Sequence, residues 1–232
     1  MSGFRHVIAT RFNVRLPEYP VAATSAWLSH RFDLFERFCL PSVRSQTNQN
    51  FDWLVLCDPG MPAEFKNRLE AYRHSGSFHP VYADGRFCQA MVQRAVAPFL
   101  TAPHLITTRL DNDDAICRTF VETVQNCFAA QNFEFLNFPH GYIWKDGQLY
   151  RGQHWTNSFI SLIERAQNVS TVYNGNHMRL KELGPIRQIG NGPGWLQVIH
   201  RHNLANHVWG APRPIEELFA DFGIAPESLR AP

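Results

Sequence analysis

The sequence lacks any apolar run long enough to cross a membrane. No stretch of its 232 residues approaches the roughly 20 consecutive apolar residues that span a bilayer. The first residues, MSGFRHVIATRF, lead directly into a strand-like segment and contain no apolar core of a secretion signal. We therefore expect a cytoplasmic protein without a transmembrane segment.

A strong charge of one sign is also missing. The chain has 22 Lys and Arg residues against 20 Asp and Glu residues, a net charge of +2 with neutral histidines. Such a balance produces no basic field that would hold a nucleic acid or an anionic membrane. We expect no nucleic-acid partner, and any anionic ligand must be held by a local site.

The five cysteines include no CxxC pair. An odd number of cysteines among apolar or helical neighbours is typical of free thiols in a reducing compartment rather than of a disulfide framework. We expect Cys39, Cys57, Cys117 and Cys127 to be buried free thiols.

Two common nucleotide-binding motifs are absent as well. No GxxxxGK[ST] phosphate loop occurs, and GNGPGW at Gly190 lacks the third glycine of GxGxxG and does not follow the first strand. These absences exclude kinases, NTPases and dinucleotide oxidoreductases. The chain also has no internal repeat, low-complexity tract or linker, which predicts a single domain over residues 1–232.

What the sequence does contain is an alternation of strand-like and helix-like patterns. Strands are predicted at 6–10, 51–57, 79–83 and 105–110, and helices at 28–43, 62–76, 91–99 and 116–127. Pro41 is expected to kink the first of these helices or to begin a second turn. This order predicts an α/β fold of Rossmann type, a mostly parallel sheet with helices on both faces. Segments at 133–138, 142–144 and 148–150 then predict an added meander or hairpin that turns at Asp146-Gly147, within a mixed C-terminal region of strands and loops.

Four polar residues in a row, Asp111-Asn112-Asp113-Asp114, follow the fourth strand. Ligands of parallel sheets lie at the carboxyl ends of the strands, and three adjacent carboxylates repel one another unless a cation is present. The cluster therefore predicts a site for Mg²⁺ or Mn²⁺ held by Asp111 and Asp113. The alternative is a helix cap, in which Asp113 or Asp114 caps a helix that starts near Ala115; we expect Asp114 to be the cap.

Several segments together resemble a known family. LPSVRSQTNQNFDWLVLCDPG and RLDNDDA resemble nucleotide-sugar glycosyltransferases with the GT-A fold and their Asp-x-Asp motif. ATRFNVR, FERFCLPSVRSQTNQNF, TTRLDNDDA and WLQVIHRHN are similar to a bacterial family of rhamnosyltransferases, from about residue 6 to about residue 210. The resemblance implies a GT-A-like domain in which about residues 1–115 bind the nucleotide sugar and about 116–232 face the acceptor. It also implies a metal-dependent enzyme that moves a sugar from a nucleotide-diphosphate donor to a glycan or other hydroxyl acceptor.

The resemblance also implies roles for single residues. Asp111 and Asp113 match the pair that holds the metal on the donor diphosphate. Residues expected to contact the donor nucleotide are Thr10, Arg11 and Asn13 beside the base, Asp58 facing the nucleoside, and Arg94 on the helix before Asp-x-Asp. Arg109 either pairs with phosphate or only balances the carboxylates.

Three histidines lie close together near the C-terminal end, in WLQVIHRHNLANH. GT-A enzymes often complete the metal shell with a histidine there, and His200 and His202 would share one face of a strand. Of the two we favour His200 as the ligand because it closes the apolar run, and the alternative for any single histidine is a hydrogen-bonded residue in or beside the core. A zinc site that includes His207 is disfavoured, since no cysteine pair or HExxH spacing accompanies it.

A general base is not evident. Inverting relatives carry an acid well after Asp-x-Asp, and the corresponding stretch, about 186–197, contains none. The candidates are Asp146, Glu164, Glu182 and His177, which follows an Asn-Gly turn and would contact acceptor or diphosphate, or lie in a surface loop. With Asp113, His177 forms the expected catalytic set, and a retaining mechanism without a base stays open.

Two other functions compete with the glycosyltransferase. A sugar- or nucleotide-sugar-binding protein with the same fold but no turnover would account for the missing base, because function belongs to the site and not to the fold. A sugar-1-phosphate nucleotidyltransferase would need a glycine-rich basic loop after the first strand, and ATRFNVRLPEYP contains no glycine.

Overall fold

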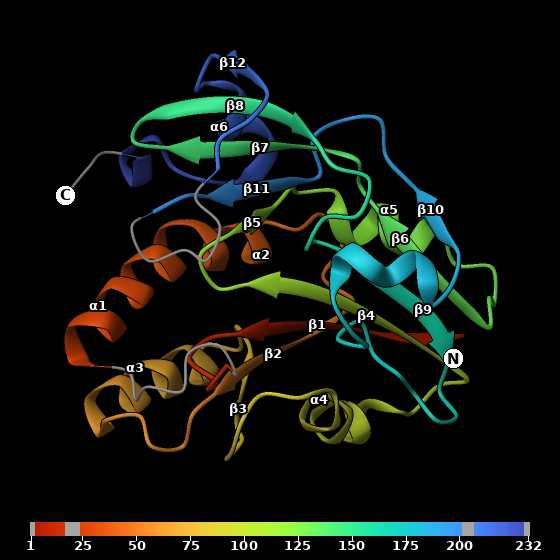
Figure 1. Ribbon diagram of the computed structural model, residues 1–232. Coiled ribbons are helices and arrows are strands. Elements are labelled where there is room, and N and C mark those ends of the chain that lie inside the picture. The colour runs from red at the N-terminus through yellow and green to blue at the C-terminus, as the bar shows by residue number, and fades with distance from the viewer. Residues whose placement is uncertain (1–2, 17–23, 201–206, 230–232) are drawn as a thin grey trace.

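A twisted sheet of seven strands forms the base of the molecule (Figure 1). The computed structural model describes residues 3–16, 24–200 and 207–229. The strands of this main sheet are β1 (Phe4–Arg11), β2 (Asp52–Cys57), β3 (His79–Tyr82), β4 (His104–Asp111), β6 (Phe133–Asn137), β9 (Ser161–Arg165) and β10 (Ile186–Gln188), in the spatial order β10-β6-β9-β4-β1-β2-β3.

The centre of the main sheet is parallel. β1 lies between β2 and β4 and runs parallel to both, and β3 continues the parallel arrangement beside β2. Among the described strands of the main sheet, only β9 runs against its neighbours, β4 and β6. The short apolar segments of β1, β2 and β4 suit this centre because a parallel strand is covered on both faces. The predicted mostly parallel α/β sheet is confirmed.

Helices cover both faces of this sheet. The helical segments of the described chain are α1 (Ser25–Leu34), α2 (Leu40–Arg44), α3 (Ala63–His74), α4 (Gln89–Val96), α5 (Phe120–Asn126) and α6 (Glu217–Phe222), with the π-helical segment η1 (Phe35–Cys39) and the short 3₁₀ segments η2 (Ala97–Phe99), η3 (His177–Glu182) and η4 (Pro226–Leu229). Successive residues of β1 point to opposite faces: Val7 packs with Val92 of α4, and Ile8 packs with Phe32 of α1.

A second, smaller sheet stacks beside the first. It consists of β5 (Ala115–Ile116), β7 (His140–Lys145), β8 (Gln148–Gln153), β11 (Trp195–Val198) and β12 (Ala211–Arg213), in the order β12-β8-β7-β11-β5. The predicted hairpin is β7–β8, and Asp146 and Gly147 at its turn have φ values of 48° and 81°. Two positive φ values match the twist of the flanking strands. The predicted meander is wrong in one respect, since β6 joins the main sheet and not the hairpin.

The helix predicted over 28–43 continues through Pro41. The backbone N–H of Leu40 bonds to the carbonyl of Phe35, five residues back, as is typical of a π turn. Proline lacks an N–H and its ring collides with the carbonyl four residues earlier. The wider turn of η1 directly before α2 accommodates Pro41 without ending the helix.

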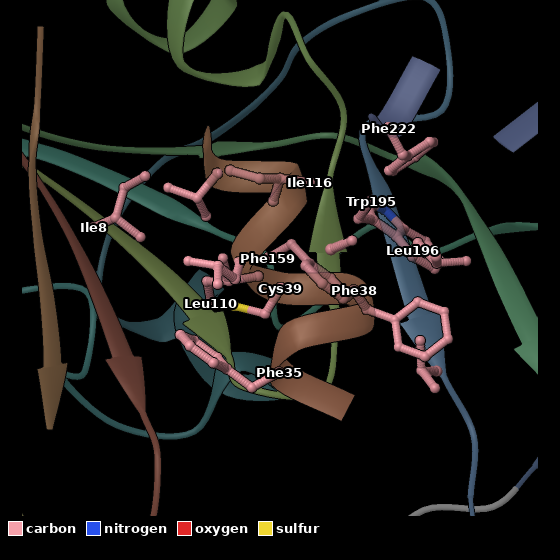
Figure 2. Packing of buried hydrophobic residues seen from close by; sticks show 14 of the residues in the cluster. Ile8, Phe35, Phe38, Cys39, Leu110, Ile116, Phe159, Trp195, Leu196 and Phe222 are labelled. Carbon is pink, nitrogen blue, oxygen red and sulfur yellow. The ribbon is translucent and has the colours of Figure 1, made fainter. Parts of the chain in front are cut away.

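The η1 segment packs between the two sheets (Figure 2). Phe35 and Cys39 lie with Leu110 of β4 in one buried cluster, which extends through Phe38 to Trp195 of β11. Gly141 of β7 is needed for this packing, because a Cβ atom there would stand 2.0 Å from the Trp195 ring.

Two further predictions need correction. Ile116 was expected on a helix, but it pairs with Trp195 in the second sheet, and the helix begins only at Phe120. Cys39, Cys57 and Cys117 are buried free thiols as predicted, whereas Cys127 is free but only half-buried. In the part of the chain that the structure describes, no helix is long and apolar enough to cross a membrane.

Candidate functional site

The acidic turn, residues 111–114, connects the two sheets. Asp111 ends β4 of the main sheet, and Ala115 begins β5 of the second. The parallel register of β1 and β4 sets Arg11 directly beside Asp111. The turn therefore lies at the carboxyl edge of the parallel strands, where ligands of such sheets bind.

Two arginines hold Asp111. Arg11 forms a two-pronged pair with it, from Nε to Oδ1 at 3.0 Å and from an Nη to Oδ2 at 2.8 Å. Arg109 donates a further bond to Oδ2 at 2.8 Å. Burial alone would raise the pKa of Asp111, but Arg109 and Arg11 hold that pKa well below its ordinary value. Asp111 is therefore an anion fixed between two cations.

Aromatic rings orient these two arginines. The guanidinium carbons of Arg11 and Arg109 lie 5.7 and 5.6 Å from the centre of the Tyr173 ring, and that of Arg11 lies 5.5 Å from the Phe87 ring. The hydroxyl of Tyr173 donates to the carbonyl of Ala9 at 3.0 Å, which fixes the ring against β1. Cation–π contacts of this kind stabilise a guanidinium without using its N–H groups.

Asp113 contacts an arginine and a histidine through one oxygen. Its Oδ2 lies 2.7 Å from Nη1 of Arg31 on α1 and 2.9 Å from Nε2 of His200. His200 follows β11 by two residues, and β11 pairs with β5 next to the turn, which brings His200 there. Its other ring nitrogen, Nδ1, lies 3.2 Å from Nε2 of His30. Burial raises the pKa of Asp113, but Arg31 and His200 outweigh burial and lower it.

Asp114 has a structural role different from the predicted helix cap. Its Oδ1 accepts a hydrogen bond of 2.9 Å from the backbone N–H of Val198, so it attaches the end of β11 to the acidic turn. The cap prediction is wrong because the chain after the turn pairs as β5 instead of starting a helix. Burial, and then the carboxylates of Asp113 and Asp111, raise the pKa of Asp114 well above its ordinary value.

The ligand types at Asp113 and His200 fit a divalent cation. Carboxylate oxygens suit Mg²⁺ and Mn²⁺, and imidazole adds a nitrogen ligand. A positive group already contacts both atoms, because Nη1 of Arg31 lies 3.4 Å from His200 Nε2 as well as against Asp113. Asp111 does not complete a set of three ligands with this pair. Within residues 3–16, 24–200 and 207–229, no three His, Cys, Asp or Glu side chains lie close enough together to hold a metal ion. The predicted convergence of three ligands is thus not present there, and His202 lies outside the described residues.

Three buried N–H groups around the acidic turn have no acceptor within the described structure. They are Nε of Arg31, Nε of Arg109 and Nδ2 of Asn112. A buried donor left without a partner costs about 1 to 3 kcal/mol, so such groups are rare in folded proteins. Their grouping indicates a place where a ligand with several acceptor oxygens is expected.

Of the predicted bases, His177 is the one whose pKa responds to charges of this cluster. Burial, then the positive charge of Arg109, lowers the pKa of His177 to about 4, and Asp111 also acts on it. Glu164 is buried elsewhere and accepts bonds from the backbone N–H groups of Ser170 and Thr171 at 2.7 and 2.8 Å. Asp146 lies in the hairpin turn, and Glu182 pairs with Arg179 at the surface.

The remaining predicted contacts to the nucleotide divide into two groups. Asn13 and Asp58 lie together, since Oδ1 of Asn13 accepts from the backbone N–H of Asp58 at 2.9 Å. Burial raises the pKa of Asp58, but hydrogen bonds from Arg15 and the Gly60 amide outweigh it and lower the pKa. These residues line the end of β2 as expected.

Thr10 and Arg94 have no contact with the carboxylates of the acidic turn in the described structure. Thr10 is fully buried, and its hydroxyl is bonded to Trp53. Arg94 is exposed on α4, and it has no hydrogen bond or ion pair with any residue that the structure describes. Neither side chain contacts Asp111 or Asp113 in the described structure.

Two residues of the site carried no sequence signal. Arg31 lies 82 positions before Asp113 in the chain, inside a helix whose arginines have no motif. Tyr173 reaches Ala9 across 164 positions. Only the folded chain brings either of them to the acidic turn.

Comparison with known proteins supplies the family context. A family model described as "Putative rhamnosyl transferase" matches residues 18–212. No curated protein matches the chain. Among solved structures, the chain is similar to S. aureus TarS 1–349 in complex with UDP, at 10% sequence identity and a TM-score of 0.52, over 85% of this chain and 61% of that chain.

The chain thus spans less than two thirds of that TarS chain. It is also similar to a nucleotide-diphospho-sugar transferase from Desulfovibrio desulfuricans G20, at 10% identity and a TM-score of 0.42, over 83% of this chain and 84% of that chain. At such identities likeness concerns the fold, and the likeness to TarS confirms the predicted GT-A-like architecture.

Proposed function

The chain belongs to the family described as "Putative rhamnosyl transferase", and we propose that it transfers a sugar, rhamnose by the family's description, from a nucleoside diphosphate donor to a hydroxyl group of an acceptor. The acceptor is a glycan or another molecule that presents a hydroxyl group. The acidic turn and the arginines around it are the site at which the donor diphosphate binds.

The group of unpartnered N–H donors is the observation that supports this proposal most directly. Nε of Arg31, Nε of Arg109 and Nδ2 of Asn112 are buried beside the turn without an acceptor in the described structure. A diphosphate offers several acceptor oxygens in a small volume, and charged N–H···O bonds to phosphate are stronger than neutral ones. Diphosphate binding would therefore offer acceptors to N–H groups of this kind.

The charge of the site agrees with an anionic ligand. Arg11, Arg31 and Arg109 surround the two carboxylates of Asp111 and Asp113, whose pKa values are lowered, so three fixed positive charges face two negative ones. The surplus of one positive charge lies in a mostly buried place, where charge interactions are screened less than at the surface.

We also propose that the site uses Mn²⁺ or Mg²⁺, held by Asp113 and His200 together with oxygens of the donor diphosphate. When bound, the cation would neutralise charge on the diphosphate leaving group. Arg109 and Arg11 would then orient the phosphates, and the end of β2 with Asn13 and Asp58 would receive the nucleoside. Arg109 thereby pairs with phosphate rather than only balancing the carboxylates.

His177 is the group proposed to act on the acceptor. With a pKa lowered to about 4, its ring is neutral near pH 7 and can accept a hydrogen bond from a hydroxyl group. The charges of Arg109 and Asp111 both act on its ring, which agrees with a place near the proposed diphosphate. We propose that His177 orients this hydroxyl and takes up its proton as the sugar is transferred.

The cellular compartment proposed is the cytoplasm. Cys39, Cys57 and Cys117 are buried free thiols in the structure, as is common where thiols are kept reduced. Activated nucleotide sugars would meet the enzyme there as small soluble substrates.

The test is release of a nucleoside diphosphate from a panel of nucleotide sugars, with Mn²⁺ present or with EDTA. We expect one donor in the panel to release its nucleoside diphosphate. This release should depend on Mn²⁺ and should disappear in Asp113→Asn. Arg94→Met serves as a matched control, because this exposed arginine has no contact with the carboxylates of the turn in the described structure. Binding of a nucleotide sugar without release, with or without a hydroxyl acceptor, would instead establish a binding protein.

A further inference from the structure

Arg31 contacts the same two atoms that would hold the divalent cation. Its Nη1 lies 2.7 Å from Oδ2 of Asp113 and 3.4 Å from Nε2 of His200, and these two atoms are themselves 2.9 Å apart. All three side chains are largely buried, with exposed fractions of 16%, 8% and 9%. A protein cation therefore stands at the position of the proposed metal ligands.

We propose that the guanidinium of Arg31 competes with the divalent cation for Asp113 and His200. When the cation binds, the guanidinium leaves these two side chains and pairs with the diphosphate of the sugar donor. This inference rests on the proposed function, because it assigns a role to Arg31 within the same site. It makes metal binding and diphosphate binding mutually dependent through one side chain.

Competition follows from electrostatics. Two positive charges a few ångströms apart repel each other, and the repulsion is stronger in a mostly buried site than in bulk water. The Oδ2 atom of Asp113 already receives hydrogen bonds from both Arg31 and His200, so a cation at this oxygen meets a site that is already occupied. A divalent ion that binds Oδ2 and Nε2 must therefore displace the Arg31 Nη1.

The geometry selects Arg31, and not Arg11, as the arginine that changes partner. Arg11 is fixed to Asp111 by two bonds, from Nε and from an Nη. Arg31 holds Asp113 through Nη1, and its buried Nε has no acceptor in the described part of the chain. A single bond is easier to exchange than a pair, and the unpartnered Nε gains an acceptor when a phosphate oxygen arrives.

Arg31 also has a support that does not depend on Asp113. Its guanidinium carbon lies 5.1 Å from the centre of the Trp27 ring on the same helix. A cation–π contact of this kind stabilises the positive group while leaving its N–H directions open. The side chain can thus leave Asp113 for a nearby phosphate without losing every favourable contact.

The experiment measures Mn²⁺ binding by the electron paramagnetic resonance signal of the free ion. It compares wild type with Arg31→Met, which keeps the apolar stem but removes the charge. Arg68→Met is the matched control, because Arg68 on α3 pairs with Glu36 and contacts neither Asp113 nor His200. Melting temperatures of all three proteins verify that each is folded, and Arg31→Lys provides a second variant that retains the charge without the planar group.

Without an anion, Arg31→Met is expected to bind Mn²⁺ at least tenfold more tightly than wild type and than Arg68→Met. Arg31→Lys is expected to lie between wild type and Arg31→Met. Equal or weaker binding by Arg31→Met would show that Arg31 does not compete, and would overturn the inference. Absence of Mn²⁺ binding in both wild type and Arg31→Met would overturn it as well.

The second arm repeats the titration with inorganic pyrophosphate, and a titration without protein corrects for Mn²⁺ held by pyrophosphate itself. Because coupling between two ligands is reciprocal, pyrophosphate is expected to tighten Mn²⁺ binding in wild type by a larger factor than in Arg31→Met. Equal factors would overturn the transfer of Arg31 to the diphosphate. Turnover of a nucleotide sugar by wild type is recorded in parallel, so failure of this inference with turnover intact leaves the proposed function standing.

Discussion

The indole Nε1 of Trp53 donates a 2.9 Å hydrogen bond to the hydroxyl oxygen of Thr10, between the adjacent strands β2 and β1. Thr10 is fully buried and Trp53 nearly so. This bond satisfies a buried indole N–H inside the core of the main sheet, so the hydroxyl of Thr10 is used for structure.

Thr10→Val is therefore expected to lower stability and to leave nucleotide binding unchanged. Valine has nearly the same shape but accepts no hydrogen bond, so the indole N–H loses its partner at a cost of about 1 to 3 kcal/mol. Urea unfolding gives the stability, and calorimetric titration with a nucleoside diphosphate gives the affinity. Weakened affinity at unchanged stability would mean that Thr10 contacts substrate after all.

Asp113 and Asp114 are expected to respond differently to the same substitution. Asp113→Asn removes a charge that faces Arg31 and His200, and the turnover of the sugar donor should fall by about 100-fold, since leaving-group charge grows in the transition state. Asp114→Asn keeps an oxygen that accepts from the Val198 amide, and the raised pKa of Asp114 already disfavours its charged form. Its activity and melting temperature should stay close to wild type. Equal losses of turnover in the two variants would contradict this division.

Arg109 and Arg94 provide a matched pair for donor binding. Arg109→Met removes a guanidinium beside Asp111 whose Nε has no acceptor in the described structure. It should weaken nucleoside diphosphate binding by roughly tenfold or more, the loss of a charged hydrogen bond worth about 1.5 to 3 kcal/mol. Arg94→Met changes an exposed side chain on α4 and should leave affinity unchanged. The dissociation constants of the nucleoside diphosphate for the two variants are the measurement. A larger loss of affinity in Arg94→Met than in Arg109→Met would show that the donor binds over α4 instead.

His177→Gln separates action on the acceptor from binding of the donor. Glutamine keeps polar contacts but takes up no proton, so turnover should fall by about 100-fold, whereas nucleoside diphosphate affinity should change little. Turnover as a function of acceptor concentration and a separate titration with the nucleotide provide the two values. If affinity and turnover fell by the same factor, His177 would be a diphosphate contact and not a base.

The stability of the protein in mild acid should depend on His6. Burial lowers the pKa of His6 from 6.5 to about 3, so the folded protein keeps the ring neutral while the unfolded chain takes up a proton below pH 6.5. Protons bound only by the unfolded state reduce stability as the pH falls, by up to about 1.4 kcal/mol per pH unit. His6 lies 2.8 Å from the Thr108 hydroxyl and 3.2 Å from Nε2 of Gln125, contacts that glutamine can also make.

We therefore expect the free energy of unfolding of wild type to fall more steeply between pH 6.5 and about 4 than that of His6→Gln. Carboxylates affect both proteins alike, so the difference between the two curves isolates His6. Urea unfolding at several pH values gives both curves. Parallel curves would mean that His6 is already protonated, or free to become so, in the folded state.

Much of the fold could be predicted because it depends on local patterns. The apolar strands, the helices between them and the Asp146-Gly147 turn each follow from the periodicity or conformational preference of nearby residues. The errors arose where a distant partner decided the outcome. Ile116 continues a helical spacing with Phe120 but forms a strand, because Trp195 of β11 lies beside it.

The sequence by itself determined the parallel sheet, the acidic turn at the end of β4, and Arg11 at the end of β1, because alternating strands and helices form βαβ units whose parallel strands end at one edge. Only the tertiary structure decided which charges the turn meets. Arg31 and His200 lie 82 and 87 positions from Asp113, and ion pairing depends on distance in space, which no local pattern records. The same holds for Thr10, whose hydroxyl is assigned to the core by Trp53, 43 positions away.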